Sequence, residues 1–247
     1  MPSPVKESIW PERVLWFVAA LAVAQAIGIA GWYWPGSMPD TDTSGVWIAL
    51  ADDAAQGDFY RPLQSPLGTG GTRYMPLFFS LHGVAIKLGF SPVGSGICLT
   101  LASALLFIGS LGLLLRLLGV APASAWPACL LMTGTVTFGM MSLTVRGDFL
   151  AAALNLGGVA MALSAQQSAR NSRWIWAGIL FGAAVLTKLT TIFGLLAVVG
   201  WLVFQRKPRR LEHLLAGFGL ILLLGLSTIH FVSDGRIWDS FRAVAHG

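Results

Sequence analysis

The stretch WIWAGILFGAAVLTKLTTIFGLLAVVGWLVF, residues 174–204, is 31 residues long and almost entirely apolar. One membrane-spanning helix needs about 20 such residues, so this run is too long for one span and short for two. Lys188 interrupts it in the middle, between Thr187 and Thr190. The run therefore predicts two short helices that meet at Lys188.

The composition of the rest of the chain agrees with a membrane protein. Of 247 residues, 55% are hydrophobic and 11% are charged, and the mean hydropathy is +0.71. Soluble domains carry roughly 25% charged residues. The net charge of +5 lies largely in short loops between apolar runs, where basic residues orient a chain in the membrane. We therefore exclude nucleic acid as a partner.

The predicted fold class is all-α: a polytopic integral-membrane helical bundle with about seven membrane segments. The whole chain, 1–247, forms one transmembrane domain. We expect the segments at about 14–34, 94–118, 126–145, 149–163, 214–232 and the two halves of 174–204. The first is a retained span, because an aromatic belt and not a small-residue cleavage site follows it.

A long external loop, about 35–93, separates the first two spans. Residues Pro76–Leu88 within it are apolar but too few to cross a bilayer, so we expect an interfacial helix there. Earlier in the loop, Val46, Trp47 and Leu50 recur at helical spacing, and Gly57 marks a stop. The loop thus carries two interfacial helices, the first capped by a residue between Asp42 and Ser44.

Counting spans puts most basic residues on one side and every aspartate on the other. The inner segments hold Lys6, Arg13, Arg116, Arg170, Arg173, Arg206, Lys207, Arg209 and Arg210. Treating Pro76–Leu88 as a span would place Gln205–Arg210 outside, against the positive-inside tendency. We therefore expect a cytoplasmic N-terminus.

The external carboxylates are the candidates for chemistry. Asp40, Asp42 and Asp148 can each accept a proton from a hydroxyl or hold a divalent cation, Mg²⁺ or Mn²⁺. The alternative is structural, because an aspartate at the start of a helix commonly caps it. Asp52, Asp53 and Asp58 have the spacing of a solvated helix face and its exit.

Three basic residues are candidates for binding an anion on the same side. Arg73, next to Tyr74, either binds phosphate or anchors the chain at the interface. Arg146 precedes Asp148 by two residues, and Lys188 needs a counter-charge or a polar cavity inside its apolar run. The four histidines and two cysteines share no metal-ligand spacing, and no glycine-rich nucleotide motif is present.

The order of these motifs resembles a known superfamily. The chain has an acidic pair, Asp40 and Asp42, before a helix, then Arg-Tyr-Met-Pro-Leu (73–77), Arg-Gly-Asp-Phe-Leu-Ala (146–151) and Ala-Gly-Ile-Leu-Phe-Gly-Ala-Ala-Val-Leu-Thr-Lys (177–188). It resembles the GT-C membrane glycosyltransferases, in particular the dolichyl-phosphate-mannose mannosyltransferase and aminoarabinose transferase-like branch, of the glycosyltransferase family 39 type. The resemblance covers most of residues 10–245.

The resemblance implies a sugar transfer on the outer side of the membrane. The donor would be a polyprenyl-phosphate sugar, the acceptor is unidentified, and one displacement would invert the anomeric centre. Asp42, or second Asp40, would be the base, with Asp148 as a further carboxylate. Arg73 with Tyr74, Arg146 and Lys188 would hold the carrier phosphate. A divalent cation at Asp42 and Asp148 is left open, and no other cofactor is implied.

Family members are longer than 247 residues, so the resemblance implies that this chain corresponds to an N-terminal half. The expected location is a bacterial inner membrane, with the active face periplasmic or extracellular. One alternative is an inactive or truncated relative that binds the lipid carrier or serves in assembly. A secondary transporter would show paired broken helices in repeated halves, whereas only the break at Lys188 is of this kind.

Overall fold

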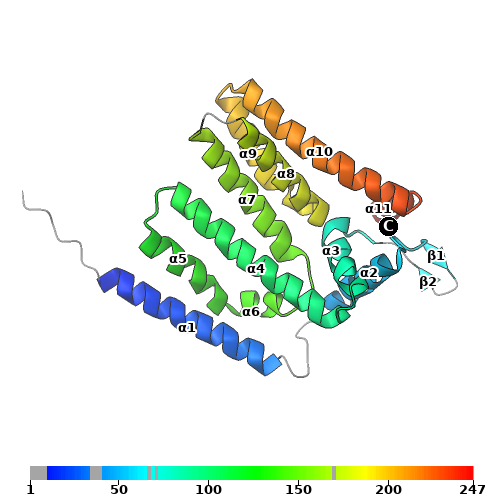
Figure 1. The fold of residues 1–247 in the computed structure, drawn as a ribbon, viewed down its shortest axis with the longest axis horizontal. Coiled ribbons are helices and arrows are strands. Elements are labelled where there is room, and N and C mark those ends of the chain that lie inside the picture. Colours follow the sequence, from blue (N-terminus) through cyan, green and yellow to red (C-terminus); the bar gives the residue numbers. More distant parts are fainter. Residues whose placement is uncertain (1–9, 34–40, 66–67, 70–71, 169–170, 247) are drawn as a thin grey trace, which may run out of the picture.

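A computed structural model of the chain describes residues 10–33, 41–65, 68–69, 72–168 and 171–246. Long helices lie side by side in a bundle, and shorter elements cross one end of it (Figure 1). The long helices are α1 (Trp10–Tyr33), α4 (Pro92–Leu117), α7 (Asp148–Gln166) and α10 (Pro208–Val232). The shorter bundle helices are α5 (Pro122–Leu131), α6 (Val136–Ser142), α8 (Ser172–Thr187) and α9 (Phe193–Phe204).

The elements across the end of the bundle come from the first loop and from the last residues of the chain. They are α2 (Thr41–Gln56), α3 (Pro76–Lys87), α11 (Arg236–His246) and an antiparallel hairpin of β1 (Gln64–Ser65) and β2 (Gly68–Thr69). We call this end of the bundle the site end. Both interfacial helices predicted for the loop are confirmed as helices, and α2 ends directly before Gly57, which has a positive φ of 88°.

The described helices have the lengths and surfaces of membrane segments. Four are long and apolar enough to cross a membrane: Pro11–Trp32, α4, α7 and α10, while α8 and the stretch that includes α9 are shorter and apolar. Large apolar side chains cover their outer faces, for example Phe17, Leu105 and Leu223. The all-α membrane fold is therefore confirmed. The expected number of about seven segments stays a prediction.

The apolar run 174–204 is broken at Lys188, as the sequence predicts. Helix α8 ends at Thr187, Lys188 has an extended backbone, and a 3-10 turn η2 (Leu189–Ile192) leads into α9. The Thr187 hydroxyl donates to the Ala183 carbonyl, and the Thr191 hydroxyl donates to that of Lys188. Such local bonds satisfy backbone groups where the helix ends.

The third expected segment, 126–145, differs from a simple span. It consists of α5 and α6 joined by a 3-10 turn η1 (Met132–Gly134). The Thr135 side chain caps α6 by accepting from the Phe138 N–H. A Cβ on Gly134 would lie 2.8 Å from the Ala22 Cβ, so η1 packs closely against α1 at the interruption.

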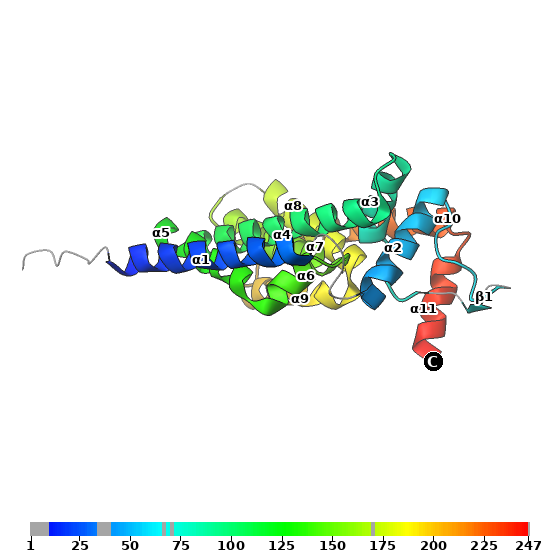
Figure 2. The same ribbon diagram turned by 90° about the horizontal axis from the view of Figure 1, so that it is seen from below.

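The two ends of the bundle carry different residues. The connections α4–α5, α7–α8 and α9–α10 lie away from the site end (Figures 1 and 2). In or beside these connections are the basic residues Arg116, Arg173, Arg206, Lys207, Arg209 and Arg210. The arrangement has the separation that the span count predicts, while the orientation in a membrane stays a prediction.

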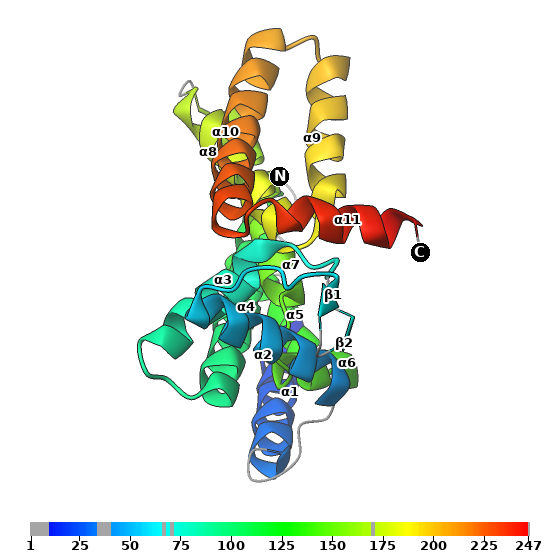
Figure 3. The ribbon, with the colours of Figure 1, turned by 90° about the vertical axis from the view of Figure 1, so that its right-hand side faces the viewer.

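The tail of the chain after α10, residues 233–246, contains helix α11, which crosses the end of α10 (Figure 3). Ile237 is fully buried, and the Phe241 ring lies 6.4 Å from the Tyr60 ring, edge to face. An Arg236 Nη1–Asp58 Oδ1 ion pair of 2.7 Å also joins α11 to the first loop. The tail thus packs on the loop.

Glycines bring α8 and α10 into direct backbone contact. A Cβ on Gly178 would lie 2.0 Å from the Leu214 carbonyl oxygen, and one on Gly217 would lie 2.1 Å from that of Ile175. Small residues at such positions let membrane helices approach closely, where packing replaces the hydrophobic driving force. This contact fixes α8, at whose end Lys188 lies.

We expect Gly178→Ala to destabilise the protein by roughly 1–3 kcal/mol, because the added methyl group meets backbone and not a movable side chain. Thermal unfolding in detergent measures this. The matched control is Gly200→Ala in α9, where nothing lies within 4 Å of the new Cβ and the melting temperature should stay or rise. Equal melting temperatures for the two variants would contradict the packing argument.

Candidate active site

A cavity of about 510 Å³ lies at the site end, where four separate parts of the chain meet. These parts are the start of α2, the segment before α3, the segment before and at the start of α7, and the break after α8. Its lining residues are Thr43, Trp47, Arg73, Tyr74, Met75, Arg146, Asp148, Thr187, Lys188, Leu189 and Thr190. Five predicted site residues are thus brought together: Arg73, Tyr74, Arg146, Asp148 and Lys188.

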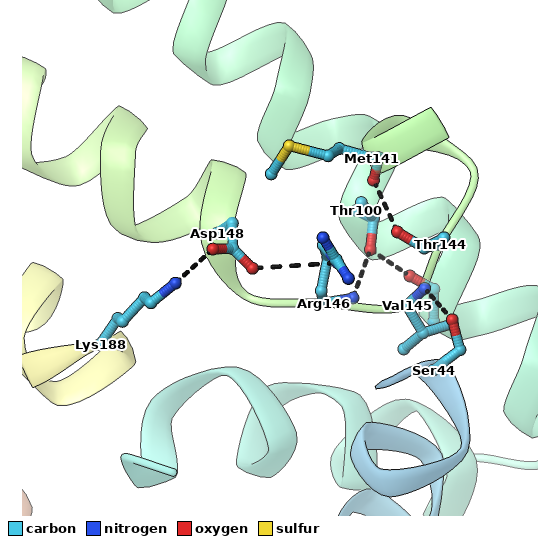
Figure 4. Close-up of polar contacts among 9 residues, drawn as sticks. Ser44, Thr100, Met141, Thr144, Val145, Arg146, Asp148 and Lys188 are labelled. Atoms are coloured by element: carbon cyan, nitrogen blue, oxygen red, sulfur yellow. Dashed lines mark hydrogen bonds and ion pairs between the residues drawn. The ribbon is translucent and has the colours of Figure 1, made fainter. Parts of the chain in front are cut away.

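Asp148 lies between two basic side chains. Its Oδ1 accepts a hydrogen bond from the Lys188 Nζ, and its Oδ2 is 4.0 Å from the Arg146 Nε (Figure 4). As the first residue of α7, Asp148 also lies at the positive end of that helix. Asp148 is therefore the counter-charge that the apolar sequence on both sides of Lys188 predicts.

The residues before Asp148 are fixed by contacts with three other helices. A Cβ on Gly147 would lie 3.1 Å from the Phe78 Cβ and 3.2 Å from the Thr187 Cγ2, so any larger residue would require these side chains of α3 and α8 to shift by a few tenths of an ångström. The Ser44 hydroxyl of α2 accepts from the Val145 N–H at 3.1 Å. These contacts therefore fix the backbone of residues 145–147, directly before α7 begins.

A hydroxyl of α4 also accepts a hydrogen bond from the backbone in this segment. Thr100 is fully buried, and its Oγ1 is the acceptor for the Arg146 N–H at 3.4 Å (Figure 4). The Thr100 hydroxyl itself donates to the Gly96 carbonyl of its own helix. Sequence reasoning missed Thr100, because a threonine inside an apolar helix usually bonds only to that helix. It also missed Ser44 as the acceptor for the Val145 N–H, although Ser44 lies two residues after Asp42.

Another part of the cavity wall is the short segment Arg73–Met75. The Tyr74 ring packs on the Trp47 ring with centroids 4.5 Å apart, and Trp47 meets Phe78 edge to face at 5.1 Å. The Tyr74 N–H donates to the Thr72 hydroxyl. Arg73 is exposed on the wall, whereas Met75 is buried and precedes α3 as its N-cap residue.

The predicted base is described only in part. Asp40 lies outside the described residues, and Asp42 is the second residue of α2 with its side chain outside them. Because α2 begins at Thr41, residues 42–44 lie within its first turn, and the expected cap by one of them is wrong. Thr43 lines the cavity, so the first turn of α2 reaches the site.

The other carboxylates of the first loop form separate ion pairs. Asp53 was expected on a solvated face, but it is 8% exposed and accepts hydrogen bonds of 2.7 and 2.5 Å from Arg61. Asp58 pairs with Arg236 of α11. Asp52 accepts a hydrogen bond from Gln56 on the exposed face of α2. None of the three lines the cavity.

His82 is a core residue of α3 and not a cavity residue. It is fully buried, and its Nε2 lies 2.7 Å from the Pro92 carbonyl oxygen. Burial lowers the pKa of His82, because removal from water disfavours the imidazolium form. The ring is therefore neutral near pH 7 and donates from Nε2.

The charges around the cavity favour an anion. The described lining residues include three basic side chains, Arg73, Arg146 and Lys188, and one carboxylate, Asp148. Among the described residues no group of three or more His, Cys, Asp or Glu could hold a metal ion, and Asp148 already pairs with two basic groups. The described donors alone do not make a cation site, and the side chain of Asp42 lies outside them.

The fold and the cavity define a multi-pass helical membrane protein with a site rich in basic residues at one end of its bundle. The chain belongs to the dolichyl-phosphate-mannose-protein mannosyltransferase family, whose sequence model matches residues 76–231. The resemblance to GT-C membrane glycosyltransferases is thereby confirmed. No curated protein and no solved structure matches the chain. The matched range contains Arg146, Asp148 and Lys188, and follows Arg73 and Tyr74.

We expect a favourable coupling of roughly 1 kcal/mol between Asp148 and Lys188 in a double-mutant cycle of Asp148→Asn and Lys188→Gln. Asp148→Asn removes the carboxylate that pairs with Lys188, Lys188→Gln leaves Asp148 paired with Arg146 alone, and the double variant removes both members of the pair. Free energies of unfolding in mixed micelles give the coupling. The exposed pair Asp239–Arg242 is the control, with a coupling near zero. A zero coupling for Asp148–Lys188 would show that Lys188 does not need this counter-charge.

Proposed function

We propose that this protein transfers a sugar from a polyprenyl-phosphate donor to an acceptor hydroxyl in the cavity at the site end. The observation that carries the proposal is the meeting of Arg73, Arg146 and Lys188 around one cavity at the end of apolar helices. Arginine and lysine both bind phosphate well. Membership of the mannosyltransferase family supports the sugar, and the apolar helices support a donor that arrives by the membrane.

The proposed reaction is a single displacement at the anomeric carbon. Asp42 takes the proton from the acceptor hydroxyl, whose oxygen then bonds to that carbon while the bond to the donor phosphate breaks. The phosphate keeps the electron pair, and Arg73, Arg146 and Lys188 stabilise its charge. Because the acceptor attacks opposite the departing phosphate, the configuration inverts.

In this mechanism Asp148 acts on the groups that bind the phosphate. Its two carboxylate oxygens face Lys188 and Arg146, so it orients both basic side chains. No step needs a metal ion, because three basic groups supply the positive charge. The acceptor is any hydroxyl that reaches Asp42 from outside the bilayer.

We further propose that the site end faces away from the cytoplasm, in a plasma membrane such as the bacterial inner membrane. The support is the set of basic residues in or beside the connections at the opposite end, including Arg173 and Arg206–Arg210. Short cytoplasmic loops carry an excess of such residues. The N-terminus is then cytoplasmic.

Replacing the proposed base tests the reaction. We expect Asp42→Asn to lower kcat by about 100-fold or more, because the amide cannot accept the proton. The assay uses reconstituted protein with polyprenyl-phosphate-linked mannose and membrane extract as acceptor. Asp52→Asn, on the exposed face of the same helix, is the matched control and should keep its rate. Wild-type kcat in Asp42→Asn would exclude this residue as the base.

Replacing a proposed phosphate ligand tests the donor. We expect Arg73→Ala to weaken binding of a polyprenyl phosphate about tenfold or more, because a charge-assisted hydrogen bond is lost. Equilibrium binding to protein in nanodiscs measures this. Arg242→Ala, which removes an exposed arginine away from the cavity, should bind as wild type. An equal loss in both variants would indicate only a general charge effect.

A further inference from the structure

Tyr60 does not line the cavity, yet it connects the cavity wall to the C-terminal helix. It is 2% exposed and has a φ of 57°, which is rare for a bulky residue. A residue keeps such a conformation only where its surroundings hold it firmly. The contacts of Tyr60 with its neighbours are therefore relevant to the structure of the site.

The hydroxyl of Tyr60 donates a hydrogen bond of 2.9 Å to the Tyr74 carbonyl oxygen. Burial raises the pKa of Tyr60, because removal from water disfavours the phenolate. The hydroxyl is therefore protonated near pH 7 and can donate this hydrogen bond. This bond joins two residues that are 14 positions apart: Tyr60 lies between α2 and β1, and Tyr74 lies between β2 and α3.

The ring of Tyr60 is held by residues from α3 and α11. Its centroid lies 5.8 Å from that of Phe79 and 6.4 Å from that of Phe241, both edge to face. Ile237 of α11 belongs to the same buried cluster. The ion pair between Arg236 and Asp58 fixes α11 two residues before Tyr60. The position of the hydroxyl thus depends on the last helix of the chain.

The Tyr74 carbonyl lies in the segment that forms one wall of the cavity. The Tyr74 ring packs on the Trp47 ring, and the Tyr74 carbonyl accepts a hydrogen bond from the Tyr60 hydroxyl. Arg73 is the preceding residue, and its exposed side chain extends from this backbone at the cavity lining. Movement of the Tyr74 carbonyl would move Arg73.

We propose that Tyr60 is a positioning residue, whose hydroxyl fixes the Arg73–Tyr74 backbone so that Arg73 reaches the donor phosphate. The proposal rests on the proposed function for the role of Arg73. It gives α11 a part in the site: through Phe241 and Ile237 this helix holds the ring that holds the cavity wall.

The kinetic test is Tyr60→Phe, which removes only the hydroxyl. The KM for the polyprenyl-phosphate donor should rise about three- to tenfold, with kcat within about twofold, as expected for the loss of one hydrogen bond. In an Arg73→Ala background the same change should have no further effect. A rise of equal size in both backgrounds, or no rise at all, would overturn the proposal.

A second readout does not need sugar transfer. Met75→Cys, made in a protein with Cys98→Ala and Cys129→Ala, places a thiol on the wall next to Tyr74, at a position that is 5% exposed. Adding Tyr60→Phe should raise its rate of labelling by a maleimide at least about threefold. The control Thr133→Val also removes one hydroxyl bond to a carbonyl, in η1, and should leave the rate unchanged.

The two readouts separate the two proposals. A protein that transfers no sugar but shows faster labelling would contradict the proposed function and support the positioning role. An unchanged labelling rate in Tyr60→Phe would overturn the positioning role whatever the activity. If Tyr60→Phe does not fold, Phe241→Leu keeps the hydroxyl but loosens the ring, and labelling should rise with it as well.

Discussion

The ion pair between Asp148 and Lys188 is the constraint on which the site depends. An ammonium group inside an apolar run is costly unless a counter-charge meets it, and Asp148 is that counter-charge. The pair ties the start of α7 to the end of α8. Gly147, which lies close to Phe78 and Thr187, and the glycines that bring α8 against α10 position the two helix ends that carry the pair. Helix packing thus places the two charges together.

The cavity walls are assembled from backbone contacts between distant segments. Ser44 of α2 and Thr100 of α4 accept from the consecutive backbone N–H groups of Val145 and Arg146. The aromatic rings of Trp47 and Tyr74 form another part of the wall. None of these contacts involves a charged side chain, yet they fix the backbone from which the side chains of Arg146 and Arg73 extend. The chemistry proposed for the site is thus carried by few residues and positioned by many.

Much of this arrangement could be predicted from the sequence, because a charge in an apolar run is a strong signal. Lys188 predicts both the break in 174–204 and its need for a partner, and the count of spans predicts that Arg73 and Asp148 lie on one side. Helix α11 and the break between α5 and α6 were not predicted. The Phe241 ring packs on the ring of Tyr60, which is far away in the chain, and Gly134 is explained only by its contact with α1. Local patterns do not contain such partners.

Helices α7 and α8 are short in comparison with α4 and α10, which pack against them, and this has a consequence for the depth of the ion pair. Helix α8 has 16 residues and α7 has 19, which at 1.5 Å per residue correspond to about 24 and 28 Å. Helix α4, with 26 residues, extends about 39 Å. Since the hydrocarbon layer is about 30 Å thick, acyl-chain length would govern how far lipid head groups stand above Lys188. Hydrophobic mismatch is thereby linked to access from the bilayer.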